Sequence, residues 1–419
     1  MSIALLMACG GGSNSVPSIS TQPTSVTTVV GRSAEFTVSA SGRPTPTYLW
    51  RHDGEDLTSQ ITSTCTISGT KLTDAGEYTV VVTNTQGSAT SAAATLTVKD
   101  VPNLSRPFGL AVDGSSLYVS DSLTHMVYMI DATTGAQTAL AGTYNWPGSQ
   151  DGTGTDATFS SPQGLALDGS GNLYVADYGN HTIRKIVIAT KAVTTLAGSP
   201  GEYGTDNAAG TSARFKFPVG LAFDGTSSLY VGDSGNHAIR KIDLSNKEVS
   251  TFAGTAGTSG SSDGTPGSFS SPNGVTVDAS GNVYVADYGN STIRKITSLG
   301  AVSRLAGVTG TPGTSNGTGS DAHFYWPSGI CLDASGNLLV ADTYNHAIRK
   351  VTTAGAVTTL AGSIGTSGNV DTATDVTPYF NMPTGVAVNS AGLAYVTDFH
   401  NGLIRKVTST GVVSTVIVP

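Results

Sequence analysis

The side chains best suited to chemistry recur as a set through the last three-quarters of this sequence. One copy of the set is Asp177, Asn180, His181 and Arg184. A carboxylate near an imidazole could act in acid–base catalysis or bind a metal ion. The Asp recurs in six copies and the Arg in five, at Asp121, Asp177, Asp233, Asp287, Asp342 and Asp398, and at Arg184, Arg240, Arg294, Arg349 and Arg405. Because a residue of every copy serves the copy itself, we expect these carboxylates to accept turn N–H bonds and to pair with Arg. We assign none of them a catalytic role.

Metal ligands of the usual spacing are missing from the sequence. Cys9, Cys65 and Cys331 lie far apart, and no Cys or His pair has zinc-site spacing. The segment 151–156 carries oxygen-bearing side chains that resemble part of a calcium loop, but no bidentate Glu follows it. We therefore predict no cofactor and no metal site, and calcium is the one metal that any segment suggests.

Aromatic residues differ from copy to copy in the long segments that join successive copies. They are Tyr144, Trp146, Tyr203, Tyr325, Trp326 and Tyr379, and further aromatic residues follow the repeated Asp at Tyr178, Tyr288, Tyr344 and Phe399. Exposed Trp and Tyr are favoured anchors for peptides or sugars. The alternative is that these rings only cover the top of the domain. Trp146 and Trp326 are the strongest candidates for ligand contact.

Four short apolar segments in each copy must position these residues. Pro-x-Gly opens each copy, with a period of 54 to 56 residues, as in Pro162-Gln163-Gly164. Strand-like runs follow, such as 173–177, 182–186 and 193–196, with turn residues between them. Four strands joined by tight turns make one antiparallel sheet, and six such sheets bury their faces when they close into a ring.

The pattern G-[LV]-x-[VLF]-D, then G-N-x-Y-V-A-D-x-x-N-H-x-I-R-K, resembles NHL repeats. The resemblance implies an all-β fold, with a six-bladed β-propeller over residues 101–419. The first copy departs from the pattern, with Thr124 and Met129 among the changed residues. A Phe three residues before each later Pro, such as Phe159, is expected to tie the joining segment to its sheet. The joining segments and the Asn-His turns should share one face, where propellers usually bind.

Residues 18–99 form a separate strand-rich region. The run Asp74-Ala75-Gly76-Glu77-Tyr78 resembles the D-x-G-x-Y of immunoglobulin domains. The resemblance implies a β-sandwich before the propeller, with Trp50 in its core and Tyr78 as a tyrosine corner. Phe36 and Val80 stand where such domains carry their disulfide. We expect this region to act as a spacer.

The N-terminal residues 1–17 resemble a bacterial lipoprotein leader followed by a Gly/Ser linker. Leu6, Met7 and Ala8 precede Cys9 as in a lipobox, which implies cleavage before Cys9 and a lipid on its thiol. No Lys or Arg precedes the apolar run, so we expect the true start to lie upstream. Gly10 after the cysteine resembles outer-membrane lipoproteins. The alternative is a chance cysteine in a disordered tail.

Two functions remain open from the sequence. The net charge of −8 and the lack of a basic run argue against nucleic acid. The first hypothesis is a non-enzymatic binding or scaffold protein of the cell envelope, lipid-anchored or secreted, whose loop face recognises an envelope protein or glycan. The second is a propeller enzyme, resembling lyases or lactonases with a metal at the central channel. The propeller has Glu202 and Glu248 as its Glu residues, both outside the first strands, so we favour the first hypothesis.

Overall fold

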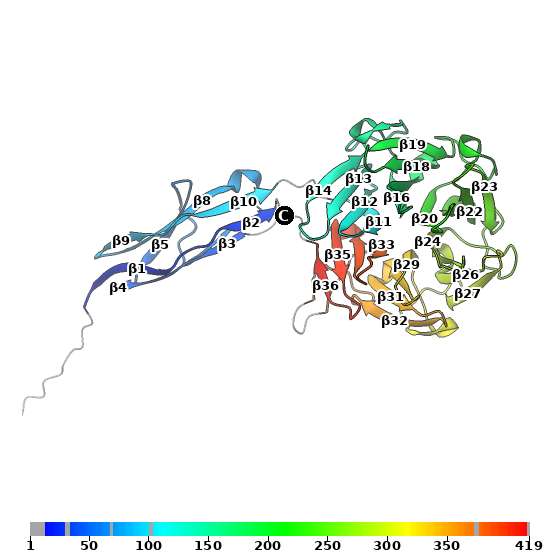
Figure 1. The fold of residues 1–419 in the computed structure, drawn as a ribbon. Helices are drawn as coiled ribbons and strands as arrows, with labels where there is room; N and C mark the ends of the chain where they lie inside the picture. The colour runs from blue at the N-terminus through cyan, green and yellow to red at the C-terminus, as the bar shows by residue number, and fades with distance from the viewer. Residues whose placement is uncertain (1–12, 30–33, 68–69, 100–103, 373–376, 417–419) are drawn as a thin grey trace, which may run out of the picture. The chain divides into compact units, whose positions relative to one another are not determined.

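The computed structural model describes residues 13–29, 34–67, 70–99, 104–372 and 377–416. These residues form two compact units that divide near residue 102, and each is described by itself (Figure 1). Within the described ranges, no helix has the length and apolar composition needed to cross a membrane. Cys9, the expected site of lipid attachment, lies outside the described residues.

The first unit is a sandwich of short strands. Its largest sheet has the order β2-β10-β8-β5-β6, with β9 also paired to β8, and the pairs β1-β4 and β3-β7 complete it. The strands are β1 (Ser15–Thr21), β2 (Val26–Val29), β3 (Ala34–Thr37), β4 (Ser39–Arg43), β5 (Thr47–His52), β6 (Glu55–Leu57), β7 (Thr64–Ile67), β8 (Gly76–Asn84), β9 (Gly87–Thr90) and β10 (Ala94–Lys99), with a 3-10 turn at η1 (Leu72–Asp74).

The core of this sandwich is aromatic where an immunoglobulin domain would have its disulfide. Trp50 is fully buried and its indole N–H donates to Thr62 O at 2.9 Å. Phe36 stacks on Tyr78 with ring centroids 4.7 Å apart, and Val80 is fully buried beside them. The Tyr78 hydroxyl donates to Asp74 O at 2.9 Å, which confirms the predicted tyrosine corner.

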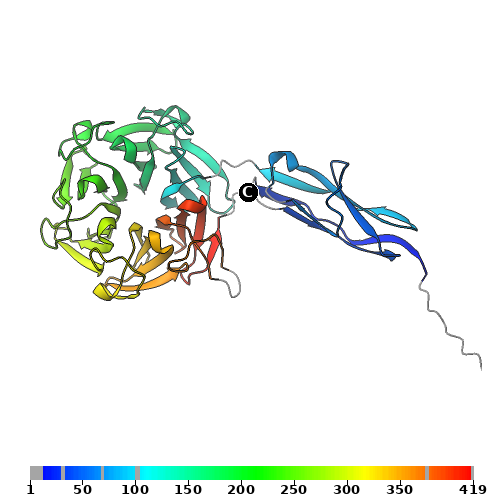
Figure 2. The same ribbon diagram turned by 180° about the vertical axis from the view of Figure 1, so that it is seen from behind.

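The second unit is a ring of six antiparallel sheets, the blades, each built from consecutive strands (Figures 1 and 2). The predicted six-bladed propeller is therefore confirmed. The blades are numbered 1 to 6 in chain order, and the strands of each blade are given from the axis outward. Blade 1 contains β11 (Pro107–Asp113), β12 (Ser116–Asp121), β13 (Met126–Asp131) and β14 (Gln137–Ala141); blade 2 contains β16 (Pro162–Leu167), β17 (Asn172–Asp177), β18 (Thr182–Val187) and β19 (Ala192–Ala197); blade 3 contains β20 (Pro218–Phe223), β21 (Ser228–Asp233), β22 (Ala238–Asp243) and β23 (Val249–Ala253). Blade 4 contains β24 (Pro272–Val277), β25 (Val283–Asp287), β26 (Thr292–Ile296) and β27 (Val302–Gly307); blade 5 contains β29 (Pro327–Leu332), β30 (Leu338–Asp342), β31 (Ala347–Val351) and β32 (Ala356–Ala361); blade 6 contains β33 (Pro383–Val388), β34 (Ala394–Asp398), β35 (Leu403–Val407) and β36 (Val413–Thr415).

Short 3-10 turns and two short outer strands complete the propeller. Blades 2 to 6 have a 3-10 turn between their second and third strands. The other 3-10 turns and the two short strands lie in the connections between blades. They are η3 (Tyr178–Asn180), η5 (Ser234–Asn236), η6 (Tyr288–Asn290), η8 (Thr343–Asn345) and η9 (Phe399–Asn401) in the turns, and β15 (Gly152–Thr153), η2 (Gly154–Asp156), η4 (Gly210–Ser212), β28 (Gly317–Thr318) and η7 (Gly319–Asp321) in the connections.

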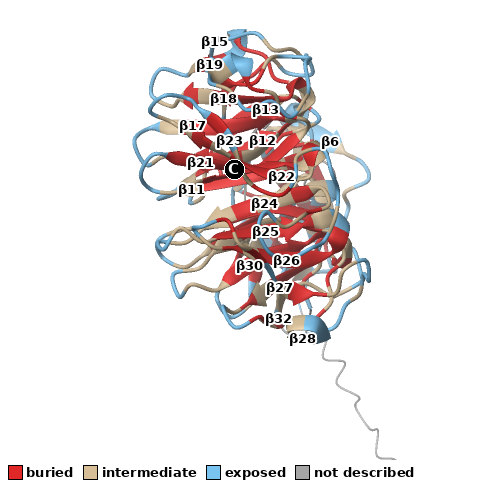
Figure 3. Cartoon of the chain, turned by 90° about the vertical axis from the view of Figure 1, so that its right-hand side faces the viewer, coloured by how far each residue is buried: buried red, intermediate tan, exposed pale blue. Residues whose placement is uncertain are grey.

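The middle strands of each blade are buried on both faces because a neighbouring blade covers each face. In β17 every residue after Asn172 is buried, whereas the fourth strand β19 is less uniformly buried, with Thr194 exposed and Ala192 and Thr195 partly exposed. Figure 3 shows this change from buried inner strands to exposed outer loops. The apolar runs of the sequence therefore mark strands packed between sheets, as the repeat pattern predicts.

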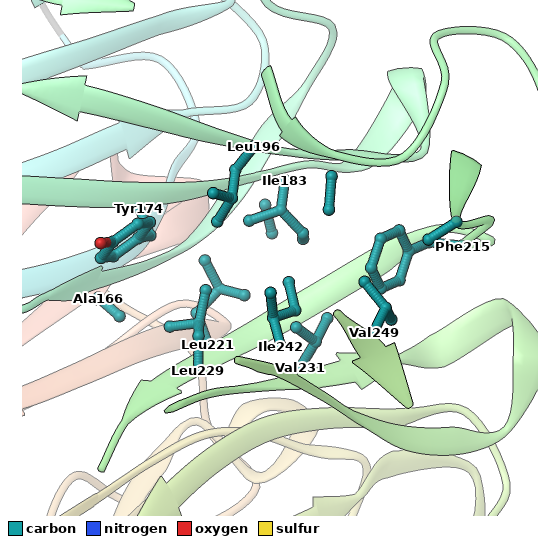
Figure 4. Close-up of a cluster of buried hydrophobic side chains, with 13 residues drawn as sticks. Ala166, Tyr174, Ile183, Leu196, Phe215, Leu221, Leu229, Val231, Ile242 and Val249 are labelled. Atoms are coloured by element: carbon teal, nitrogen blue, oxygen red, sulfur yellow. The ribbon is translucent and has the colours of Figure 1, made fainter. Parts of the chain in front are cut away.

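Apolar side chains from adjacent blades interlock at each junction. Between blades 2 and 3, Ile183 and Leu196 face Leu229 and Ile242, and Phe215 from the connection closes the outer end of the cluster (Figure 4). The equivalent Phe of the other connections is also fully buried. This confirms that the repeated Phe ties each connection to its blade, and burial of one such side chain contributes about 1.5–3 kcal/mol.

The glycine of each Pro-x-Gly lies where neighbouring first strands approach most closely. A Cβ on Gly220 would collide with Asn273 O of the next blade, and one on Gly385 would collide with Phe108 O of blade 1. The same collision with the next blade occurs at the four other glycines of this position. Only a residue without a side chain therefore lets the six first strands converge on the axis.

Within the part of the chain that the structure describes, blade 6 meets blade 1 without an exchanged strand. The hydroxyl of Thr397 donates to Phe108 O at 2.8 Å, and that of Thr384 donates to the same oxygen at 3.1 Å. Leu117 of blade 1 packs in one cluster with Tyr395 of blade 6. The ring is closed by these hydrogen bonds as well as by side-chain packing.

Candidate ligand-binding face of the propeller

The repeated Asp and Arg form a buried clamp in blades 2 to 6. In blade 2, Arg184 Nη1 lies 2.9 Å from Asp177 Oδ2, and both side chains are fully buried. Asn180 Nδ2 and the Ser160 N–H also donate to this carboxylate, each at 2.7 Å. Burial raises the pKa of Asp177 to about 6, while Arg184 and the amide donors favour the charged form, so the carboxylate is ionised at neutral pH.

The clamp holds the incoming connection against its own blade. Arg184 also donates to Thr158 O and Gln150 O at 3.0 Å and to Asp151 Oδ1 at 2.7 Å. Its guanidinium lies over the Phe159 ring, 5.2 Å from the centroid. Equivalent pairs join Arg240 to Asp233 at 2.9 Å, Arg294 to Asp287 at 3.0 Å, Arg349 to Asp342 at 2.7 Å and Arg405 to Asp398 at 2.7 Å. The predicted structural role of the repeated Asp and Arg is confirmed, although the backbone donor comes from the connection rather than from the adjacent turn.

Blade 1 explains why the first copy departs from the pattern. Tyr128 stands in the place of the clamp Arg and is buried, and Asp121 accepts backbone N–H bonds from Ser105 and Thr124. Blade 1 is the first blade of the ring, so the segment that enters it is not a connection from an earlier blade of the kind that Arg184 holds in blade 2. The degenerate first copy therefore follows from its place in the ring.

The repeated histidines link neighbouring blades. His125, His181, His237 and His346 all have left-handed backbone, with φ from 54° to 62°. Each Nδ1 accepts an N–H of the segment entering the next blade: Ser161 at 2.9 Å, Phe217 at 3.1 Å, Ser271 at 3.0 Å and Met382 at 3.1 Å, respectively. Burial lowers the pKa of all four rings, which favours the neutral form that can accept this bond.

None of the described residues that line the axis of the propeller is titratable. A cavity of about 60 Å³, large enough for a few water molecules, is lined by residues of the first strands. Its polar side chains are Ser328 and Thr384, and the rest are Phe, Gly, Leu, Val and Ile. Nor do the described residues contain a group of three or more His, Cys, Asp and Glu placed to hold a metal ion. The Asp151 carboxylate, in the segment that resembles a calcium loop, accepts bonds from Arg184 and Thr195.

The connections and the Asn-His turns form one face, called here the upper face. Asn180 Nδ2 of the blade 2 turn donates to Gly148 O of the incoming connection at 2.6 Å, which confirms that turns and connections meet. The connection then descends the outer edge of its blade, where β15 pairs with β19. The middle of this connection therefore leaves the upper face, whereas its first part and its last residues, such as Ser160 that accepts the Gly179 N–H, belong to it.

Three of the six predicted contact residues are strongly exposed on this first part. Tyr144 is 56% exposed and Trp146 is 67% exposed on the connection before blade 2. Tyr203, 64% exposed, lies on the next connection, with Lys216 Nζ 5.3 Å from its ring centroid. More than half of each of these residues is therefore exposed to solvent.

Tyr325 and Trp326 belong to a separate, half-buried cluster at the junction of blades 4 and 5. Trp326 stacks on Tyr288 at 5.5 Å and meets Tyr344 edge-on at 4.5 Å. Tyr325 contacts both Trp326 and Tyr344 at 5.2 Å. Tyr379 is not part of either group, because it packs beneath Gly368 and its carbonyl accepts a bond from Arg405.

Sequence reasoning missed two aromatic residues that complete similar contacts. Phe217 stacks on Tyr178 at 4.8 Å, and Phe108 meets Phe399 edge-on at 6.0 Å. Both pairs join residues of neighbouring blades, so neither pair is visible within one copy of the repeat. The sequence did contain one signal for these contacts, because Tyr178 and Phe399, the aromatic partners of Phe217 and Phe108, directly follow the repeated Asp.

Comparison with known families agrees with this geometry. The NHL repeat model matches residues 159–186, 269–296, 324–351 and 380–407, and each match runs from the buried connection Phe to the third strand. The propeller is built of NHL repeats. An immunoglobulin domain model matches residues 16–84 of the first unit.

Similar proteins include a longer relative and two solved structures that match over nearly their whole length. Human NHL repeat-containing protein 2 is 32% identical over 326 residues, which cover 69% of this chain but 44% of the human protein. The chain thus spans less than half the length of that relative. Two Bacteroides thetaiotaomicron structures share the fold over nearly the whole chain. A protein of unknown function has a TM-score of 0.57 and 18% identity, covering 95% of this chain and 98% of its own. An auxiliary nutrient binding protein has a TM-score of 0.56 and 14% identity, covering 96% and 97%.

Proposed function

We propose that this chain is a non-enzymatic binding or scaffold protein of the cell envelope or extracellular space. In this proposal the upper face of the NHL propeller recognises an envelope protein or glycan. The observation that carries the proposal is a difference in burial between the repeated and the variable residues of that face. Repeated polar side chains such as Asp177 and Arg184 are buried in the clamp, whereas residues that vary between blades, such as Trp146, are exposed.

The relatives support a binding or scaffold role. NHL repeat proteins match the propeller, and a protein described as nutrient binding shares the fold over the whole chain. An envelope or extracellular location is consistent with the lipobox-like sequence that ends at Cys9. The immunoglobulin-like unit would then act as the spacer between an anchor and the propeller.

A metal-dependent reaction at the channel, the second function considered from the sequence, finds no support in the axial residues. Such chemistry needs several unlike ligands that converge from different blades. The cavity lining instead consists of small and apolar residues with two hydroxyl groups. The His side chains that recur around the ring accept backbone bonds between blades.

The proposal is tested by binding of the purified chain to a glycan array and to defined envelope proteins, followed by titration of each hit. Trp146→Ala and Trp326→Ala should weaken the binding that is found. Leu299→Ala is the control, because Leu299 is 90% exposed in a turn between third and fourth strands on the opposite face. If all three variants bound with equal affinity, the upper face would not be the binding site. If no ligand were found, this result would count against a binding function.

A further inference from the structure

The residue after the repeated Asp alternates between small and aromatic around the ring. In blades 1 to 6 it is Ser122, Tyr178, Ser234, Tyr288, Thr343 and Phe399. All three aromatic rings are half-buried on the upper face, so part of each ring stays in solvent. The propeller therefore has a two-blade period at this position, in addition to its single-blade period.

The residue before each Pro alternates in the complementary sense in blades 1 to 5, whereas Met382 of blade 6 is large and departs from the alternation. In blades 1 to 6 it is Arg106, Ser161, Phe217, Ser271, Trp326 and Met382. Because the turn of one blade meets the entry of the next, the larger residues come together at alternate junctions. Tyr178 stacks on Phe217 between blades 2 and 3 at 4.8 Å, and Tyr288 stacks on Trp326 between blades 4 and 5 at 5.5 Å.

The third aromatic junction closes the ring between blades 6 and 1. There the guanidinium of Arg106 lies over the Phe399 ring, 5.8 Å from its centroid, and Phe108 meets the ring edge-on. Phe108 also lines the axial cavity. We call these three junctions the aromatic stations; they surround the end of the axis that faces the upper loops.

Hydroxyl and amide groups occupy two of the junctions between the stations, whereas the junction of blades 5 and 6 carries Met382 and a buried Thr343 that donates to Pro383 O. Between blades 3 and 4, Ser234 Oγ lies 3.4 Å from Asn273 Oδ1, and the Asn273 side chain is partly exposed. Gln163, in the equivalent position of blade 2, is also partly exposed. The end of the axis that faces the upper loops is called here the mouth. Around most of the mouth, aromatic faces thus alternate with hydrogen-bonding groups. Pyranose rings present the same combination, with apolar C–H faces and a rim of hydroxyl groups.

The charges at the mouth are positive, although the whole chain carries a net charge of −8. Lys216 directly precedes Phe217 of the first station, and its ammonium lies 5.3 Å from the Tyr203 ring centroid. Arg106 lies within the third station, and neither cation forms an ion pair with another described residue. The carboxylates that directly precede the station residues, Asp177, Asp287 and Asp398, are fully buried and accept hydrogen bonds inside their blades. Glu202, which is exposed next to Tyr203, is paired with Arg214. The mouth therefore favours an anionic ligand.

We propose that the three aromatic stations bind a glycan chain containing uronic acids, with sugar rings on the aromatic faces and carboxylates at Lys216 and Arg106. This inference rests on the proposed function and names its ligand class. Single-stranded nucleic acid also combines bases with negative charge, but it needs a continuous basic groove that two cations do not supply. A protein partner would need a central cluster of large side chains in fully desolvated pockets, whereas the three half-buried stations are separated by polar residues.

The chain itself offers matched substitutions for the test. Tyr178→Ser and Tyr288→Ser copy Ser234 of blade 3, and Lys216→Ser copies the residue found at Ser160 of blade 2. The Lys216 N–H already donates to Asp233 in the way that the Ser160 N–H donates to Asp177. These variants should therefore fold normally, which thermal unfolding checks directly.

Titration calorimetry would use oligogalacturonate, hyaluronan and alginate fragments, each beside its carboxyl-reduced counterpart. We expect a uronate chain to bind more tightly than its reduced form and less tightly as salt increases. Loss of one station should weaken binding about tenfold, and Lys216→Ser about threefold. Leu299→Ser on the opposite face should change nothing.

Equal binding of the reduced chains, unchanged affinity of Tyr288→Ser, or preference for single-stranded RNA or a peptide would overturn the inference. If Trp146→Ala still weakened binding in such a case, the proposed function would stand and only the ligand class would be wrong. Failure of every glycan, peptide and envelope protein to bind would defeat both.

Discussion

Replacement of Arg294 by Met tests whether the clamp holds each connection to its blade. Arg294 Nη1 lies 3.0 Å from Asp287 Oδ2, and Nη2 lies 2.7 Å from Asp263 Oδ1. The same guanidinium donates to Ser268 O and Ser262 O at 2.9 Å. Met retains much of the aliphatic volume but donates none of these four hydrogen bonds.

The loss of stability follows from the carboxylate that is left behind. Asp287 is fully buried, and without Arg294 its donors are Asn290 Nδ2 and the Ser270 N–H. Removing one partner of a buried ion pair costs about 3–5 kcal/mol. With an unfolding entropy of about 2.1 cal/mol/K per residue, the propeller of about 315 residues should lose roughly 5–7 °C in Tm.

Calorimetry and urea unfolding of the full chain measure this loss, and hydrogen exchange locates it. Arg304→Met is the control, because Arg304 is exposed on β27 of the same blade and should change stability by less than about 0.5 kcal/mol. Arg294→Lys should fall between the two, since an ammonium keeps the charge but not the planar fork. Residues 262–268 should exchange faster in Arg294→Met alone. If Arg294→Met unfolded within about 1 kcal/mol of Arg304→Met, the clamp would not be a major source of stability.

Three further predictions follow from contacts of single residues. Gly220→Ala should greatly lower the yield of folded protein, because its Cβ meets a carbonyl of the next blade; normal yield and Tm would show that the first strands can separate. Burial lowers the pKa of His237 below that of the unfolded chain, so its contribution to stability is lost as pH falls below about 6.5. His237→Ser, which copies Ser291, should therefore lose less Tm than the native chain between pH 7.5 and pH 5.5, and equal losses would contradict the assignment. Burial raises the pKa of Cys65 to about 11 and of Cys331 to about 12, so peptide mapping should find both unlabelled by iodoacetamide at pH 8 until urea unfolds the chain.

Features that recur in every copy were predictable from the sequence. Pro-x-Gly, the buried strands and the connection Phe repeat with the period of one blade, so each copy reports the same local environment. The role of Asp177 and Arg184 followed from their recurrence, since a catalytic site needs unlike residues from different blades. Trp50 and Tyr78 were assigned differently, from the resemblance of residues 18–99 to an immunoglobulin domain, in which both residues have known places.

Contacts between copies could not be predicted from one copy. Tyr178 and Phe217 lie far apart in sequence and meet because the turn of one blade touches the entry of the next. The outer course of the connections was also hidden, because β15 pairs with a strand that comes later in the chain. Tyr379 was grouped with exposed aromatic residues by composition, yet its connection places it beneath Gly368.

The sequence by itself determined the strands, the number of blades and the residues that each blade uses to hold its own connection. These properties are local or periodic. Equivalent positions in successive blades have the same surroundings, so the same residue type recurs at them. The tertiary structure decided which side chains of different blades meet, and so where aromatic rings and unpaired cations gather. Closure of the ring brings alternate junctions to one mouth, and that arrangement depends on the angle between sheets rather than on any segment of the chain.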